Sequence, residues 1–259
     1  MNDQLVEYHK LRPGQLLKRR KQNPVAYLGI GILEWHGLHN PLGLDGVKAH
    51  GIACHLAKKF GGVAMPPLFW GENRRDICEL QYDPEVIDVP ADHTQKICDH
   101  VKLPKEAFLK DAQRSMDNGG WRLWQELTEH IFFQLETLGF STIIPIPGHY
   151  PLFDPLDNAI ASYHQNGGKS RIFVLKDTMF SEDGTSGDHA AAFETSLMLA
   201  LYPDLVDLTQ LSADLADPNI GVLGQDPRLH ATREFGVEIL TRFEQIISDY
   251  LSRQSISPR

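Results

Sequence analysis

The 259-residue sequence predicts a single α/β domain, a three-layer α-β-α sandwich around a mostly parallel central sheet. First, residues 25–33 form a continuous apolar run, as expected of a strand that is buried on both faces. Second, further runs of strand length alternate with helical patterns of ten or more residues, which favours a parallel sheet. No internal repeat divides the chain, so we expect one domain over residues 1–259.

Strand and helix signals follow in order after the first run. Apolar residues spaced four apart (Ile52, Leu56 and Phe60) predict a helix over 46–60, which ends at a pair of glycines. A short strand at 63–65 stops at two prolines. The remaining elements that we expect are a helix at 121–138, a strand at 142–147, a helix at 154–165, a strand at 170–175, and helices at 189–202 and 230–252.

Three features fit this pattern less well. Residues 1–24 are polar and basic, and we expect them to form a surface segment. The stretch 72–120 is polar, contains prolines and lacks one clean period, so we expect it to be an elaborated segment of the domain. Two prolines, Pro145 and Pro147, are awkward in a central strand because proline offers no N–H to a sheet.

Composition narrows the function classes. The formal net charge of -9 argues against nucleic acid or an anionic membrane as the main partner. No apolar stretch is long enough to span a membrane, and the N-terminus lacks the pattern of a secretory signal. Three cysteines, none in a C-x-x-C pair, argue against a disulfide scaffold or a zinc knuckle. We therefore expect a cytoplasmic protein.

A group of metal-ligand residue types follows the first strand. Glu34 and His36 are two apart and share one face of an extended chain, while Trp35 faces the other side. Asp45 follows, just before the helix at 46–60. Two carboxylates and an imidazole suit a divalent cation. Asp45 equally suits a helix N-cap, so spacing alone leaves both interpretations open.

Two more clusters lie after later strands. His149 follows the strand at 142–147, where a lone histidine is more often structural than a ligand. Asp188 and His189 precede a helix in which Glu194 lies among apolar residues. A carboxylate in such surroundings needs a partner, and a cation would supply one. Gly29-Ile30-Gly31 starts a dinucleotide fingerprint, but position 34 is Glu rather than Gly, which counts against a nucleotide-binding protein.

These segments, taken together, resemble the creatininase (creatinine amidohydrolase) family. They occur in the family's order and cover most of residues 25–207 in outline. The matching segments are Glu34-Trp35-His36-Gly37, Pro41-Leu42-Gly43-Leu44-Asp45, Met65-Pro66-Pro67-Leu68, Gly139-Phe140, Gly148-His149-Tyr150, and His189 with Phe193-Glu194-Thr195-Ser196-Leu197-Met198-Leu199-Ala200-Leu201.

The resemblance implies a metal-dependent amidohydrolase that cleaves a non-peptide C–N bond of a small cyclic amide, formamide or related substrate. It implies a homo-oligomer, usually a hexamer, with two divalent ions per chain (zinc first, manganese or iron as alternatives). A shared, metal-activated water would attack the substrate, and His189 would protonate the departing nitrogen. The implied metal ligands are Glu34, His36, Asp45 as the bridge, His149 and Glu194, and the substrate-binding residues are Tyr150 and Asp188.

The chain also departs from the family. Pro151 stands where creatininase has a glutamate after the His-Tyr pair, and Asp154 or Asp157 could substitute for it in space. Ala192 replaces another polar residue. These changes favour an alternative, a catalytically weakened relative that binds metal or a small ligand without creatininase-type turnover. Arg74 and Arg75 could clamp an anionic substrate, or they could be exposed loop charges.

Overall fold

The central sheet has four strands, and all of them are parallel. The computed structural model describes residues 5–70, 91–184 and 186–256. Within them the strands β1 (Val25–Ile30), β2 (Val63–Ala64), β3 (Thr142–Pro147) and β4 (Arg171–Ile172) pair in the order β2-β1-β3-β4. The register joins Val25 to Thr142 and Ile30 to Pro147.

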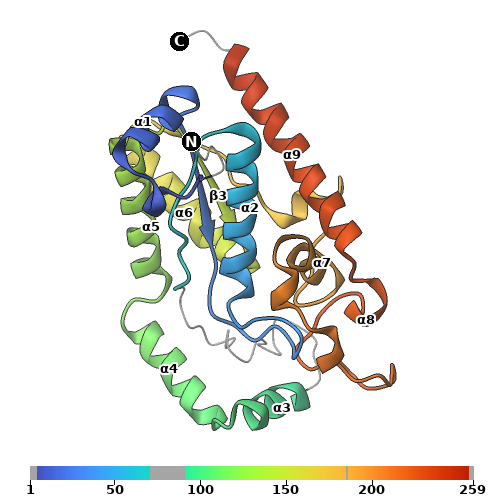
Figure 1. Cartoon of the computed structure of the whole chain (residues 1–259). Helices are drawn as coiled ribbons and strands as arrows, with labels where there is room; N and C mark the ends of the chain where they lie inside the picture. The colour runs from blue at the N-terminus through green and yellow to red at the C-terminus, as the bar shows by residue number, and fades with distance from the viewer. Residues whose placement is uncertain (1–4, 71–90, 185, 257–259) are drawn as a thin grey trace.

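Helices cover both faces of this sheet, which confirms the predicted three-layer sandwich (Figure 1). Tyr27 and Ile144 point to one face, and Leu28 and Ile143 to the other, because successive side chains of a strand alternate between the two faces of the sheet. The first face carries α2 (Leu44–Phe60), α7 (Ala192–Leu201) and α9 (Arg233–Ile256), and the second carries α5 (Trp121–Thr137) and α6 (Phe153–Gln165).

The other helices lie around the sandwich. Figure 1 shows α3 and α4 as an arm below it. No helix within the described ranges is both long and apolar enough to cross a membrane. The bounds are η1 Tyr8–Lys10, α1 Pro13–Gln22, α3 Ala91–Val101, α4 Lys105–Asp117, η2 Tyr150–Leu152, η3 Asp177–Met179, η4 Pro203–Leu205, η5 Leu208–Gln210 and α8 Pro227–His230.

Two of the irregular segments contain helices that the sequence pattern did not predict. α1 buries no residue, so it has no apolar periodicity to detect. One of its arginines nevertheless holds neighbouring backbone: Arg19 donates to the carbonyl oxygens of Leu5 and Gly62, at 2.8 and 3.2 Å. The segment 72–120 is helical in α3 and α4, whereas Arg74 and Arg75 lie outside the described residues.

The prolines of β3 face β4, the short strand at one edge of the sheet. The carbonyl oxygen of Pro145 accepts from Leu175 N at 3.0 Å, so Pro145 points toward β4. A missing N–H there breaks the ladder, and β4 pairs only as far as Ile172, well short of the predicted strand 170–175. β1 also ends before the predicted residue 33, because the chain turns into the loop that carries Glu34.

Arg228 holds the loop at 212–217 in place, and its loss should destabilise the fold. Its guanidinium donates to Asp226 at 2.7 Å and to the carbonyl oxygens of Ser212 at 3.0 Å and Asp214 at 2.8 Å. We expect Arg228→Ala to lower the free energy of unfolding in urea titrations, since Asp226 and the exposed carbonyl oxygens of the loop lose the donor that they share. Arg253→Ala, exposed at the end of α9, should change it by less than about 0.5 kcal/mol. Equal losses in the two variants would contradict this role.

Candidate metal centre

The candidate site lies where two central strands end. β1 and β3 are neighbours, and their next elements in sequence pair on opposite sides of them. Such a point, where the strand order reverses, leaves a crevice at the carboxyl ends of the strands. Glu34 and His36 follow β1, His149 follows β3, and Asp45 enters from the first turn of α2. The fold therefore brings together residues that are up to 115 positions apart in the chain.

Ligand-type atoms form two groups that share Asp45. In one, His149 Nδ1 is 2.9 Å from Glu34 Oε2 and 3.3 Å from Asp45 Oδ2. In the other, His36 Nε2 is 3.0 Å from Asp45 Oδ1 and 3.7 Å from Glu194 Oε2. Within each group the ligand atoms lie within 4.8 Å of one another. The two oxygens of Asp45 thus face different groups, as a bridging carboxylate would.

The polar atoms of these residues suit a bound cation better than hydrogen bonds among themselves. Glu34 Oε2, His36 Nε2 and Asp45 Oδ2 are buried, and none has a hydrogen-bond partner within the described residues, although the contacts are short. The backbone oxygen of Glu34 lies 3.1 Å from His36 Nδ1 and can only accept, so Nδ1 carries a proton. The lone pair of a neutral His36 is then on Nε2, which faces the carboxylates, and this is the usual arrangement of a metal-bound histidine.

Electrostatics indicate a concentration of buried negative charge. Burial opposes a charge on His36, but the carboxylates of Asp45, Glu194 and Glu34 outweigh it and raise the pKa of His36 to about 9. Burial also opposes ionisation of Asp45, yet His36 and His149 hold the pKa of Asp45 well below its ordinary value. Without a cation, a proton on His36 offsets part of this charge, and a cation bound to neutral imidazole would displace it.

His189 lies beside the two groups. Its ring lies beside that of His36, with centroids 4.3 Å apart and planes tilted by 32°, and its Nδ1 is 4.0 Å from Glu34 Oε2. Nε2 is 2.9 Å from the carbonyl oxygen of Trp35, so Nε2 bears the proton and Nδ1 faces the site as an acceptor. Burial, followed by the like charge of His36, holds the pKa of His189 well below its ordinary value. The ring is therefore neutral at pH 7.

The two predicted substrate-binding residues have different surroundings. Asp188 accepts from the backbone N–H groups of Phe193, at 2.6 Å, and Glu194, at 3.1 Å, and so caps the start of α7. Burial, and then the charge of Glu194, raise the pKa of Asp188 to about 7. Tyr150 is largely buried in η2, and its hydroxyl has no hydrogen-bond partner among the residues described.

Glu194, one of the ligands that the family resemblance implies, lies in the second group, whereas the two aspartates considered as substitutes at Pro151 lie elsewhere. Asp154 and Asp157 are exposed on α6, and Asp157 pairs with Lys176 at 3.2 Å, so neither substitutes for the glutamate that Pro151 replaces. Gly148 matters for a different reason. A Cβ there would collide with the carbonyl oxygen of Asp45, so only glycine lets the end of β3 approach α2 this closely.

Sequence reasoning missed Lys48, which is fully buried one turn after Asp45 on α2. Its ammonium donates to Glu194 Oε1 and to Asp177 Oδ2, both at 2.6 Å. Burial opposes the charge, but Asp177 and Glu194 hold the pKa of Lys48 well above its ordinary value. The available signal was its position: Lys48 lies between Val47 and Ala49 on a helix whose neighbouring residues are apolar.

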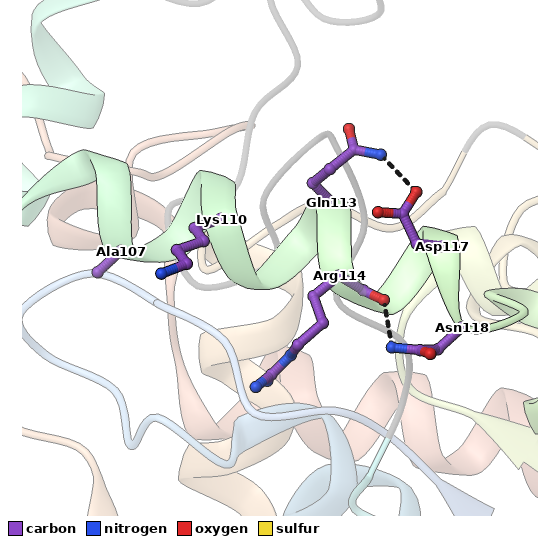
Figure 2. A pocket seen from close by; sticks show the side chains of 6 residues that line it. All are labelled: Ala107, Lys110, Gln113, Arg114, Asp117 and Asn118. Carbon is purple, nitrogen blue, oxygen red and sulfur yellow. Dashed lines mark hydrogen bonds between the residues drawn. The ribbon is translucent and has the colours of Figure 1, made fainter.

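A large cavity lies away from this centre. It measures about 710 Å³ and runs along α4, lined by residues of that helix and its end (Figure 2). Gln113 donates to Asp117 at 2.9 Å, and Asn118 Nδ2 to the Arg114 carbonyl oxygen at 2.8 Å. None of the ligand groups found within the described ranges includes these residues. Size alone therefore does not identify the functional site.

Comparison with known proteins agrees with the resemblance seen in the sequence. Residues 121–242 match the family model described as Creatininase: Creatinine amidohydrolase. A creatinine amidohydrolase from Pseudomonas putida is 25% identical over 205 residues, which cover 72% of this chain and 68% of that protein. The predicted creatininase resemblance is thereby confirmed.

Solved creatininase structures share the fold. A creatininase variant described as Zn-Zn type superposes with a TM-score of 0.67 at 21% identity, covering 98% of this chain and 99% of that one. A creatininase structure described with Mn gives a TM-score of 0.65 at 21% identity, with the same coverage of 98% and 99%.

The buried lysine should be required for stability while the centre lacks a cation. In metal-free protein, we expect Lys48→Met to lower the free energy of unfolding by about 3–5 kcal/mol, because Asp177 and Glu194 lose their shared counter-charge. Urea titration measures this loss, and Lys58→Met on the exposed side of α2 is the matched control. Adding Asp177→Asn to Lys48→Met should recover part of the loss, and a double variant as unstable as the single one would contradict the interpretation.

Proposed function

We propose that this chain, which resembles the creatininase family, is a metal-dependent amidohydrolase that cleaves a non-peptide C–N bond in a small cyclic amide, formamide or related substrate. The observation that carries the proposal is the position of Asp45, whose two oxygens face His36 and His149 at 3.0 and 3.3 Å. Two histidines and a shared carboxylate suit a pair of divalent ions.

Glu34, Asp45 and His149 would hold one ion, and His36, Asp45 and Glu194 the other. Zinc is our first choice, with manganese or iron as alternatives, because mixed imidazole and carboxylate ligands suit all three. When bound, two such ions acidify a shared water and polarise the carbonyl of the substrate. Burial of every ligand keeps bulk water from weakening these interactions.

His189 is the residue that we assign to proton movement. Amide hydrolysis adds the oxygen of water to the carbonyl carbon and breaks the C–N bond, so the nitrogen must gain a proton to leave. The water supplies that proton, and His189 Nδ1 faces the centre as the acceptor that can take it up and pass it on. Its Nε2–H bond to Trp35 fixes the ring orientation during the transfer.

Tyr150 and Asp188 have separate proposed roles. The buried hydroxyl of Tyr150 is a candidate to contact the substrate, because it has no hydrogen-bond partner in the described part of the chain. The carboxylate of Asp188 already accepts two backbone N–H groups. We therefore favour a positioning role for Asp188, in which it holds the start of α7 and with it Glu194.

The buried Lys48 favours one alternative function. In it the protein is a catalytically weakened relative of creatininase that binds a single metal ion. Both oxygens of Glu194 already accept hydrogen bonds, from Lys48 Nζ at 2.6 Å and from Ala190 N at 2.7 Å. The ammonium ion supplies a positive charge beside the second group, which lowers the need for a cation there. In this alternative the ion bound by Glu34, Asp45 and His149 remains.

Metal counting separates the two functions. For the hydrolase we expect His36→Ala to lose about one metal per chain and Asp45→Asn about two, because only Asp45 contacts both groups. Elemental analysis of protein purified without chelator measures these differences, and His164→Ala, an exposed histidine on α6, is the control. No difference between His36→Ala and the parent, with a single ion lost in Asp45→Asn, would support the one-metal alternative instead.

Turnover tests the role of His189. Across a panel of creatinine, other lactams and formamides, we expect His189→Gln to lower kcat by about 10²–10⁴-fold on any accepted substrate, as is typical for loss of a proton-transfer group. KM and metal content should change little. A parent-like kcat in His189→Gln would reject the assignment, and loss of metal in this variant would make His189 a ligand. His164→Gln again serves as the control.

A further inference from the structure

A second cluster of ligand-type side chains lies further along α2. Glu7 precedes η1, and His50 and Cys54 are one turn apart on α2. His50 Nε2 is 3.1 Å from Glu7 Oε1 and 3.6 Å from Cys54 Sγ, and the three ligand atoms lie within 4.8 Å of one another. Cys54 is nine residues beyond Asp45, or about 14 Å along the helix axis, so this cluster is separate from the centre described above.

Hydrogen bonds alone cannot satisfy this arrangement. His50 Nε2 either donates to the Glu7 carboxylate or accepts from the Cys54 thiol, because a ring nitrogen cannot do both. Lys10 holds the second oxygen of Glu7, Oε2, at 2.7 Å. Oε1 is thereby turned toward His50 and Cys54.

The spacing matches the edges of a metal coordination tetrahedron. Zinc bonds of 2.0–2.3 Å to nitrogen, oxygen and sulfur place an N–O pair about 3.4 Å apart and an N–S pair about 3.6 Å apart. The observed separations are 3.1 and 3.6 Å. One sulfur, one nitrogen and one oxygen suit a borderline cation such as Zn²⁺. His9 lies at the rim, with its Nε2 at 3.8 Å from Glu7 Oε1.

We propose that Glu7, His50 and Cys54 bind a zinc ion, with His9 or water as the fourth ligand. The ion would join the N-terminal segment, which pairs with β2, to α2. Glu7 pairs with Ala64 of β2 through a bridge, whereas His50 and Cys54 belong to α2. A cavity of about 310 Å³, lined in part by Cys54 and Tyr202, gives access to the thiol side of the site. The site is thus a clamp between the N-terminal segment and α2.

Cobalt provides a direct test because a cobalt–thiolate bond has a near-ultraviolet charge-transfer band that histidine and carboxylate ligands do not produce. We titrate Co²⁺ into the metal-free protein and expect the saturated band to correspond to one thiolate-bound cobalt per chain, whatever amount the central site also takes up. Cys54→Ser should abolish it. Cys98→Ser, which alters a buried thiol packed near Trp35 instead, should leave it unchanged. Glu7→Gln should weaken Co²⁺ binding at least about tenfold.

Two results would overturn the proposal: no charge-transfer band in the parent protein, or a band that persists in Cys54→Ser. If Cys54→Ser fails to fold, His50→Gln provides a second test. This variant keeps the thiol and should also weaken Co²⁺ binding at least about tenfold. Zinc should raise the Tm of Cys98→Ser more than that of Cys54→Ser. Equal shifts in these two variants would count against the clamp. The hydrolytic centre stays testable on its own, since Cys54 does not contact it.

Discussion

Buried negative charge is the constraint on which the centre of this protein depends. Glu34, Asp45 and Glu194 are each at most 4% exposed, and carboxylates at such depth are stable only with cations or protons beside them. The chain offsets this charge in two ways: with Lys48 on the outer side of Glu194, and with His36 and His149 on the inner side. A cation bound to the neutral imidazoles of this inner pair would supply the positive charge in place of their protons.

The sheet positions this charge. Residues after β1 and β3 meet because the two strands are parallel neighbours, and α2 begins directly above them. Helix α7 then brings Glu194 to the same point through Asp188 and the turn at Ala190, whose φ of 55° is unusual for a residue with a side chain. Strain of this kind is often found at functional sites, where the surrounding packing offsets it.

The sequence predicts the core elements well because burial leaves a pattern. β3 and α5 were predicted almost to the residue, since their apolar spacing faces the interior. α1 escaped detection because it buries nothing, and Lys48 because lysine in a helix is usually solvated. Glu34, His36 and Asp45 follow from local spacing, whereas the roles of His149 and Glu194 rest on family resemblance. Glu7 lies 43 positions before His50, a separation that no local motif can connect.

Gly148 gives the centre a fixed dimension. Because the backbone at this residue rests against the carbonyl oxygen of Asp45, main chain rather than side chain sets the separation of β3 from α2. Backbone in a strand end and a helix start has little freedom to adjust. With the proposed ligands, ions of different radius would therefore be accommodated by small rotations of the Asp45 and His149 side chains. The backbone fixes the distance between β3 and α2. Exchange of one proposed metal for another should therefore leave the fold unchanged and alter only the angles between the ligands.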